Sequence, residues 1–145
     1  MRKIFTVLFF VSFIFSSEAL FAQCDRSSAY FGEMLPNAGC GVFANYSPYG
    51  PGEYFRMPVL QGGSYTISTC NSPSVDAQIT CYQGLLTAVA DRFAYADDNG
   101  PMCSGTPASI TIVPTFTDYT RVQISEFNCQ SGGSASITVS VRQNN

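Results

Sequence analysis

Short runs in which apolar and polar residues alternate limit the fold of this chain more than any other feature. The clearest run covers residues 134–141, where every second residue is apolar and the others are serine or threonine. Successive side chains of a β-strand point to opposite faces, so a period of two predicts a strand with one buried and one solvated face. The apolar positions of this run are Ala135, Ile137, Val139 and Val141.

Six similar runs precede this one, and glycine, proline, asparagine and serine separate them. They cover residues 54–60, 64–70, 77–82, 87–95, 108–113 and 120–127. Turn residues between short alternating runs are typical of antiparallel β proteins, and seven strands suit a sandwich of two sheets. The links at residues 61–63 and 118–119 are expected to be hairpin connections. Helical signal is weak, with a turn or two expected only within residues 84–91.

Residues 1–22 have the order of a secretory signal peptide. Two basic residues precede an apolar run over residues 4–15, and a shorter polar stretch ends in the small residue Ala22. As a helix this run would reach about 18 Å, short of the roughly 30 Å hydrocarbon core of a membrane. We therefore expect cleavage, with a retained anchor as the alternative, and no membrane span afterwards.

The chain that remains, residues 23–145, has the size of a single domain with its own core. Removal of the signal leaves five arginines, no lysine and nine carboxylates. A chain this acidic has no basic patch for nucleic acid. Lipid attachment at Cys24 is a further alternative, although Gln23 occupies the place where that modification prefers a small residue.

The chain contains no histidine, so the usual Ser-His-Asp and Cys-His arrangements cannot form. We expect no catalytic residues and no enzyme activity. A glycosidase with two carboxylates is the remaining enzymatic alternative, with Asp97 or Asp98 acting opposite Asp76.

Three aspartates are the candidate metal ligands. Asp97 and Asp98 follow one another in the acidic sequence Asp-Asp-Asn, and Asp76 lies just before an earlier run. Ca²⁺ prefers several oxygen ligands, which carboxylates, asparagine and backbone carbonyls supply. The three aspartates are therefore expected to hold a structural Ca²⁺, the one cofactor that the sequence indicates. The alternative is a plain turn, because aspartate and asparagine bond their own backbone.

Aromatic residues crowd a stretch rich in proline and glycine at residues 45–55. Tyr46, Tyr49 and Tyr54 are the candidate binding patch, since aromatic side chains on loops can contact a glycan or a protein. The alternative is that these rings close one end of the sandwich core.

Several ordered motifs resemble the bacterial pre-peptidase C-terminal domain, in the variant common in secreted Bacteroidetes proteins. They are GSYTISTC at residues 63–70, VDAQITCY at 75–82, YADD at 95–98, YTRVQI at 119–124 and the pair Asn128-Cys129. The resemblance implies a jelly-roll-like β-sandwich of about seven to eight strands. Its core would cover residues 53–142, behind a loop-rich segment at residues 23–52.

Six cysteines lie behind the apparent signal, and an even number in an exported chain predicts a disulfide framework. Cys24 and Cys40 are expected to close a local loop. Cys70 and Cys129 both end strands that could lie side by side, so we expect them to pair, which leaves Cys81 with Cys103. The alternatives join Cys70 to Cys103, or leave Cys81 unpaired in the core.

These features together favour a secreted, non-catalytic binding or adhesion module that is disulfide-stapled. Its partner would be a protein or a glycan at the cell surface or outside the cell. The alternative function is a structural or secretion-assisting component of a bacterial envelope or surface assembly. The expected location is periplasmic, cell-surface or secreted.

Overall fold

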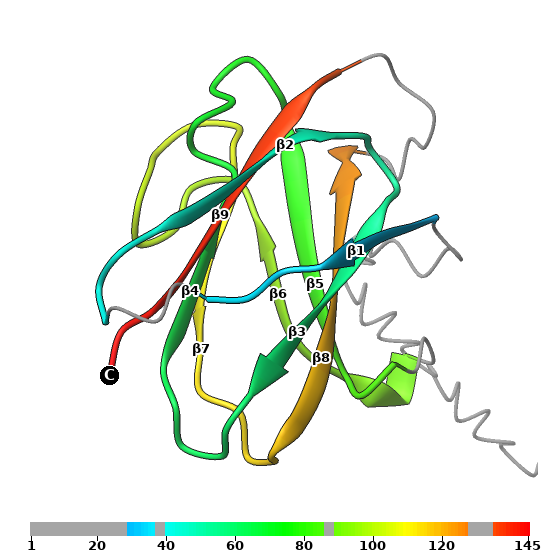
Figure 1. The fold of residues 1–145 in the computed structure, drawn as a ribbon. Coiled ribbons are helices and arrows are strands. Elements are labelled where there is room, and N and C mark those ends of the chain that lie inside the picture. Colours follow the sequence, from blue (N-terminus) through cyan, green and yellow to red (C-terminus); the bar gives the residue numbers. More distant parts are fainter. Residues whose placement is uncertain (1–28, 37–39, 86–88, 128–134) are drawn as a thin grey trace, which may run out of the picture.

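Two β-sheets pack face to face in the structure of this protein, a computed structural model (Figure 1). The structure describes residues 29–36, 40–85, 89–127 and 135–145. Its strands are β1 (Tyr30–Glu33), β2 (Ala44–Tyr49), β3 (Tyr54–Val59), β4 (Tyr65–Ser68), β5 (Ala77–Gln83), β6 (Arg92–Asp97), β7 (Ser109–Ile112), β8 (Asp118–Glu126) and β9 (Ile137–Gln143). A single turn of 3-10 helix, η1 (Val89–Asp91), lies within the segment where weak helical signal was expected.

The strands are connected as a jelly roll. Four antiparallel pairs are nested along the chain: β2 with β9, β3 with β8, β4 with β7, and β5 with β6. Folding this double ribbon gives one sheet of order β2-β9-β4-β7 and a second of order β3-β8-β5-β6, to whose edge β1 adds in parallel beside β3. The expected jelly-roll-like antiparallel sandwich is therefore confirmed.

The segment at residues 23–52, which was expected to be loop-rich, contributes β1 and β2. Neither strand has a clear alternating pattern: β1 is largely exposed, and Pro48 interrupts β2. Proline removes a backbone donor and is usually confined to the edges of sheets. The edge position of β2 accommodates it.

The links at residues 61–63 and 118–119 are not hairpin connections. Residues 61–63 lie where the chain crosses from β3 in one sheet to β4 in the other, and residues 118–119 begin β8, after the chain has crossed back from β7 at residues 113–117. The two crossings contact each other, because the amide of Gly62 donates to the carbonyl of Pro114 at 2.9 Å. Turn residues determine where a strand ends. Whether the next strand joins the same sheet or the facing sheet depends on the burial of both inner faces.

The core lies between the two inner faces. Ile137, Val139 and Val141 of β9 are fully buried, as their alternation predicted. Phe55 and Met57 of β3 are fully buried on the facing sheet. Close packing of such apolar side chains is the main source of stability for a domain of this size.

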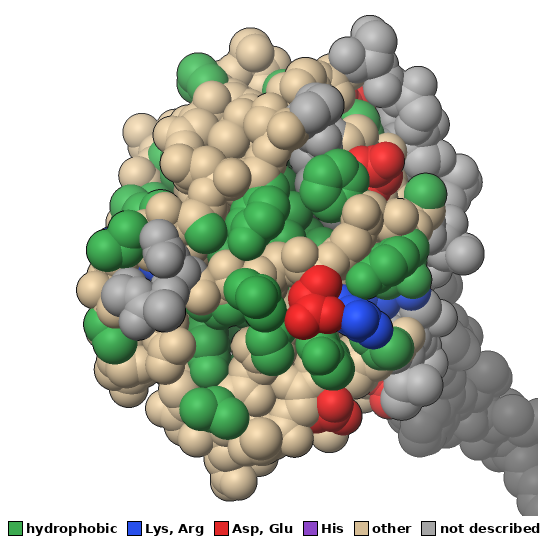
Figure 2. All heavy atoms as spheres, in the orientation of Figure 1, with side chains coloured by type: hydrophobic (Ala, Val, Ile, Leu, Met, Phe, Trp, Pro, Cys, Tyr) green, Lys and Arg blue, Asp and Glu red, His purple; other side chains and the backbone are tan. Residues whose placement is uncertain are grey.

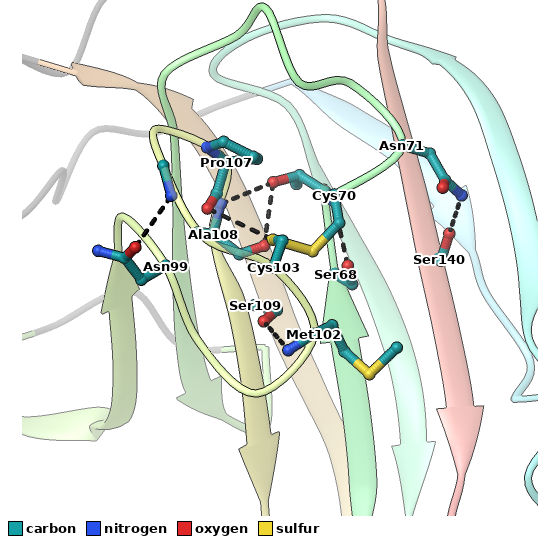
Figure 3. Close-up of a disulfide and its surroundings, with 12 residues drawn as sticks. Ser68, Cys70, Asn71, Asn99, Met102, Cys103, Pro107, Ala108, Ser109 and Ser140 are labelled. Carbon is teal, nitrogen blue, oxygen red and sulfur yellow. Dashed lines mark hydrogen bonds between the residues drawn. A yellow bond between two sulfur atoms is a disulfide. The ribbon is translucent and has the colours of Figure 1, made fainter.

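A disulfide joins Cys70 to Cys103, with 5.7 Å between the Cα atoms (Figure 3). It ties the loop at residues 98–108 to the end of β4. The preferred pairing of Cys70 with Cys129 is therefore wrong, because β4 and β8 lie in different sheets and not side by side. The alternative pairing of Cys70 with Cys103 is the one that forms.

The other two predicted bridges are not formed either. Cys81 cannot meet Cys103, because its side chain is fully buried in the core on β5, whereas Cys103 lies on a loop. Cys40 is an exposed free thiol, so it makes no bridge to Cys24. Cys24 and Cys129 lie outside the described residues, as does the expected signal peptide at residues 1–22. Among the described residues, no helix has the length and apolar character needed to cross a membrane.

Candidate functional site

Strand pairing brings the three candidate aspartates together. Asp97 ends β6 and Asp98 follows it, while Asp76 directly precedes β5. Because β5 and β6 are antiparallel, the beginning of one lies beside the end of the other, with Gln78 opposite Asp97. One carboxylate oxygen from each aspartate lies within 4.8 Å of the others. The structure therefore brings these three residues together, and we call them the aspartate cluster.

The alternative of a plain turn describes the residue next to this cluster, Asn99. Asp98 and Asn99 have φ angles of 47° and 58°, in the left-handed region that aspartate and asparagine tolerate. The side-chain oxygen of Asn99 accepts a hydrogen bond from the amide of Gly105 at 2.9 Å. Asn99 therefore shapes the loop, and its side-chain oxygen is engaged there.

The carboxylates of the aspartate cluster are under-satisfied. Asp97 accepts one hydrogen bond from the Gln78 amide at 3.0 Å. One buried oxygen of Asp76 and one of Asp97 have no hydrogen-bond partner among the described residues. Burial and the charges of Asp98 and Asp97 raise the pKa of Asp76 above its usual value. Crowded, partly desolvated carboxylate oxygens fit a hard divalent cation such as Ca²⁺.

A pocket of about 310 Å³ opens beside this cluster. Its lining includes Asp76, Glu126 and the exposed ring of Phe127. The charge of Glu126 also contributes to the raised pKa of Asp76. Negative charge is therefore concentrated at this end of the five-stranded sheet.

The predicted patch of Tyr46, Tyr49 and Tyr54 is not assembled. Tyr46 belongs to β2 in one sheet and Tyr54 to β3 in the other, because the chain changes sheets between these strands. The Tyr46 hydroxyl donates to the carbonyl of Leu35 at 3.0 Å, and the ring is half-buried against the core. Tyr46 thus follows the structural alternative. The side chain of Tyr49 lies outside the described part of the chain.

Tyr54 instead takes part in a different group of aromatic and basic side chains on the outer face of β1, β3 and β8. We call it the tyrosine–arginine cluster, and its members are Tyr30, Tyr54, Arg56, Tyr119 and Arg121. The rings of Tyr30 and Tyr54 lie 5.3 Å apart, and the Arg121 guanidinium lies 3.6 Å from the centre of the Tyr54 ring. The Arg56 guanidinium lies 5.9 Å from the Tyr30 ring and 4.9 Å from the Tyr119 ring.

Two interactions hold this cluster in place. Glu33 accepts a hydrogen bond from Arg56 Nε at 2.9 Å and lies 2.8 Å from its terminal nitrogen, which raises the pKa of Arg56. Guanidinium groups over aromatic faces add an electrostatic attraction of about 0.5 to 1 kcal/mol each where they are exposed. Tyr30 nevertheless remains 51% exposed. Figure 2 shows hydrophobic side chains, tyrosine included, around neighbouring acidic and basic side chains over the region of β1 and β3.

The sequence carried a weak signal for this cluster. Tyr54 and Arg56 are two residues apart, as are Tyr119 and Arg121, so each pair must share a strand face. The register that places Arg56 opposite Arg121 comes from the fold. Alternation alone does not show which strands are neighbours.

Comparisons with known proteins give a match in structure. No family model matches the sequence, and no curated protein sequence matches it. The fold is similar to the pre-peptidase C-terminal domain of collagenase from Bacillus anthracis, with a TM-score of 0.51 and 11% identity. The alignment covers 81% of this chain and 97% of that domain. The chain therefore has the fold of a pre-peptidase C-terminal domain, as its motifs led us to expect.

Proposed function

We propose that this chain is a non-catalytic binding module that acts at the cell surface or outside the cell. The tyrosine–arginine cluster, in which Tyr30 is exposed and Arg56 is partly exposed, is the observation that carries this function. Tyrosine and arginine are enriched among the residues that dominate binding energy at protein interfaces. Here arginines stack on tyrosine rings in a fixed arrangement, so little side-chain entropy would be lost on contact with a partner.

Two further observations support a binding role in an oxidising compartment. The Cys70–Cys103 disulfide is compatible with an extracellular location, since such bonds rarely persist in the cytosol. The absence of histidine removes the most common general acid-base residue. A protein partner is favoured over a glycan at this cluster because two tyrosine–arginine pairs lie side by side on one face of a sheet, with Arg56 opposite Arg121.

Binding of the purified protein to envelope and extracellular-matrix fractions of its source organism tests this function. Tyr30→Ala with Arg56→Ala should reduce the bound fraction at least tenfold, since loss of central interface residues typically costs more than 1 kcal/mol each. Val113→Ala, which removes an exposed side chain next to the four-stranded sheet, is the control and should bind normally. Equal binding by the double variant, or no binding by the unaltered protein, would contradict the proposed function.

We also propose that the aspartate cluster holds a structural Ca²⁺. The under-satisfied carboxylate oxygens of Asp76 and Asp97 support this site, because a cation would replace their missing partners. Ca²⁺ at 100 times its dissociation constant should stabilise the fold by about 2.7 kcal/mol and raise Tm by several degrees. Asp98→Asn should weaken this response, whereas Asp118→Asn, in a distant acidic position, should leave it unchanged. No shift of Tm on adding Ca²⁺ to chelated protein would exclude the site.

A further inference from the structure

A second pocket lies on the outer face of the four-stranded sheet, beside the disulfide. It has a volume of about 300 Å³, and its lining includes Phe43, Asn45, Ser68, Asn71, Met102 and Ser140. Asn45, Ser140 and Ser68 form a row across β2, β9 and β4, because the register pairs each with the next. We call this hollow the asparagine pocket.

One serine orients both asparagines of the pocket. Asn71 Nδ2 donates to Ser140 Oγ at 3.0 Å, and Ser140 Oγ donates to Asn45 Oδ1 at 2.6 Å (Figure 3 shows the first bond). These bonds use a donor of Asn71 and the acceptor of Asn45. Among the described residues, the Asn71 oxygen accepts no hydrogen bond and the Asn45 amide nitrogen donates none. The pocket thus presents the Asn71 oxygen as an acceptor and the two N–H groups of the Asn45 amide as donors.

Two apolar residues also line the pocket, Met102 on the loop held by the disulfide and Phe43 just before β2. Met102 is 42% exposed, and its amide donates to Ser109 Oγ at 3.0 Å. The neighbouring Cys103 is bonded to Cys70 (Figure 3). Phe43 is the second apolar residue, and the Arg142 guanidinium lies 4.7 Å from its ring centre. Arg142 also reaches the Met102 sulfur at 4.0 Å, so one arginine links the two apolar residues.

We propose that the asparagine pocket binds one sugar residue that carries two adjacent hydroxyl groups. A sugar hydroxyl can donate to the Asn71 oxygen while its neighbour accepts from the Asn45 amide, since every hydroxyl both donates and accepts. The apolar face of C–H groups on the ring would lie against Met102 and Phe43. The small volume suits one ring at the end of a glycan chain.

A peptide fits this pocket less well. Extended peptides are usually recognised at a sheet edge, where unpaired backbone groups are available. The asparagine pocket lies on a sheet face, and its central strand β9 is paired with β2 on one side and with β4 on the other. The pocket lining offers side-chain hydrogen-bonding groups. The pocket is on the opposite sheet from the tyrosine–arginine cluster, so this inference goes beyond the proposed function and can stand or fail without it.

Titration of the ¹⁵N-labelled protein with glucose, galactose, mannose and N-acetylglucosamine tests the pocket by NMR. At least one sugar should shift the side-chain amide signals of Asn45 and Asn71 in a saturable way. Asn71→Ala and Asn45→Ala should each weaken the binding of that sugar about tenfold. This is the effect of losing one hydrogen bond of about 1.4 kcal/mol. Both residues are exposed, so these variants should keep the Tm of the unaltered protein. Gln61→Ala, at an exposed turn, is the matched control.

Three outcomes would overturn this assignment. One is that none of the four sugars shifts the two amide signals. Another is that the sugar binds Asn71→Ala as tightly as the unaltered protein. The third is that triglycine, which offers the same donors and acceptors on a peptide backbone, shifts both signals while the sugars do not.

Discussion

Cys40 and Cys81 are two thiols whose surroundings give them opposite reactivities. Cys81 is fully buried between the sheets, and burial raises the pKa of its thiol to about 12. The reactive thiolate is therefore scarce at neutral pH, and no reagent reaches it in the folded state. Cys40 is exposed and unpaired. Cys81 thus acts as a small apolar core residue.

Iodoacetamide should alkylate Cys40 in the native protein at pH 8 and leave Cys81 unmodified. Peptide mass spectrometry after short exposures measures both rates. In guanidinium chloride the two rates should become similar, since unfolding removes the burial. Comparable labelling of Cys81 in native buffer would show that the core opens more readily than its packing indicates.

Asp76 makes the stability of the calcium-free protein depend on pH. Its folded pKa lies above the ordinary value of 3.8, because burial and the charges of Asp98 and Asp97 oppose ionisation. Between those two pKa values the folded protein holds a proton that the unfolded chain has released. Stability should therefore fall as pH rises through this window, and should be recovered as pH is lowered again.

Asp76→Asn should accordingly raise Tm in the presence of a chelator at pH 7, by a few degrees. The amide removes the buried charge and the repulsion from Asp97 and Asp98. The same variant should lose the rise in Tm that Ca²⁺ gives the unaltered protein, because one ligand is gone. Thermal melts with chelator and with Ca²⁺ measure both effects, and a lower Tm for the variant in chelator would contradict the first.

At the scale of elements, the loop at residues 98–108 contains a glycine that no other residue could replace without a shift of the backbone. Gly100 has a φ of 125°, and an added Cβ would overlap the backbone carbonyl oxygen of Ser109 at the start of β7. The loop is fixed there by two hydrogen bonds, from the Ser109 amide to the Asn99 carbonyl and from the Met102 amide to Ser109 Oγ.

Gly100→Ala should lower the free energy of unfolding by about 2 to 4 kcal/mol, because overlap with backbone adds to the unfavourable φ. Gly62→Ala is the comparison. Gly62 has a φ of 77° but its added Cβ would meet nothing within 4 Å, so its cost should be only about 1 kcal/mol. Urea denaturation of both variants measures the difference, and equal costs would show that the close approach to Ser109 relaxes freely.

The elements differ in how far the sequence predicted them. Alternation located β9 and β3 within a few residues, since each has one face in the core. It missed β1 and β2, which are edge strands with little buried area and no regular pattern. It could not choose partners either. Alternation therefore predicts hairpins at the two crossings between sheets, and it predicts Cys129 as the partner of Cys70, whereas the structure joins Cys70 to Cys103.

The candidate sites follow the same division. The aspartate cluster was predictable because Asp97 and Asp98 are adjacent and Asp76 precedes a neighbouring strand. The tyrosine–arginine cluster and the asparagine pocket combine residues from three or more strands or loops. Their assembly depends on strand order, which a single sequence leaves open.

At the scale of the whole molecule, the jelly roll gives the protein two independent outer faces. The tyrosine–arginine cluster lies on the five-stranded sheet and the asparagine pocket on the four-stranded sheet. The Cys70–Cys103 disulfide belongs to the second face only, where it anchors the loop that carries Met102. It also restricts the conformations of the unfolded chain, because the bonded residues are 33 positions apart.

Replacing both Cys70 and Cys103 by serine should therefore have a global and a local effect. In the chain-entropy account, opening a loop of this length lowers the free energy of unfolding by about 3 to 4 kcal/mol. Sugar binding at the asparagine pocket should weaken severalfold, because Met102 loses its anchor, while binding through the tyrosine–arginine cluster should not change. Denaturant melts measure the loss of stability, and NMR titration measures sugar binding. Binding to envelope and extracellular-matrix fractions measures the tyrosine–arginine cluster, and all binding is measured at a temperature where the variant remains folded. Equal losses at both faces would show that the two sites depend on each other through the core.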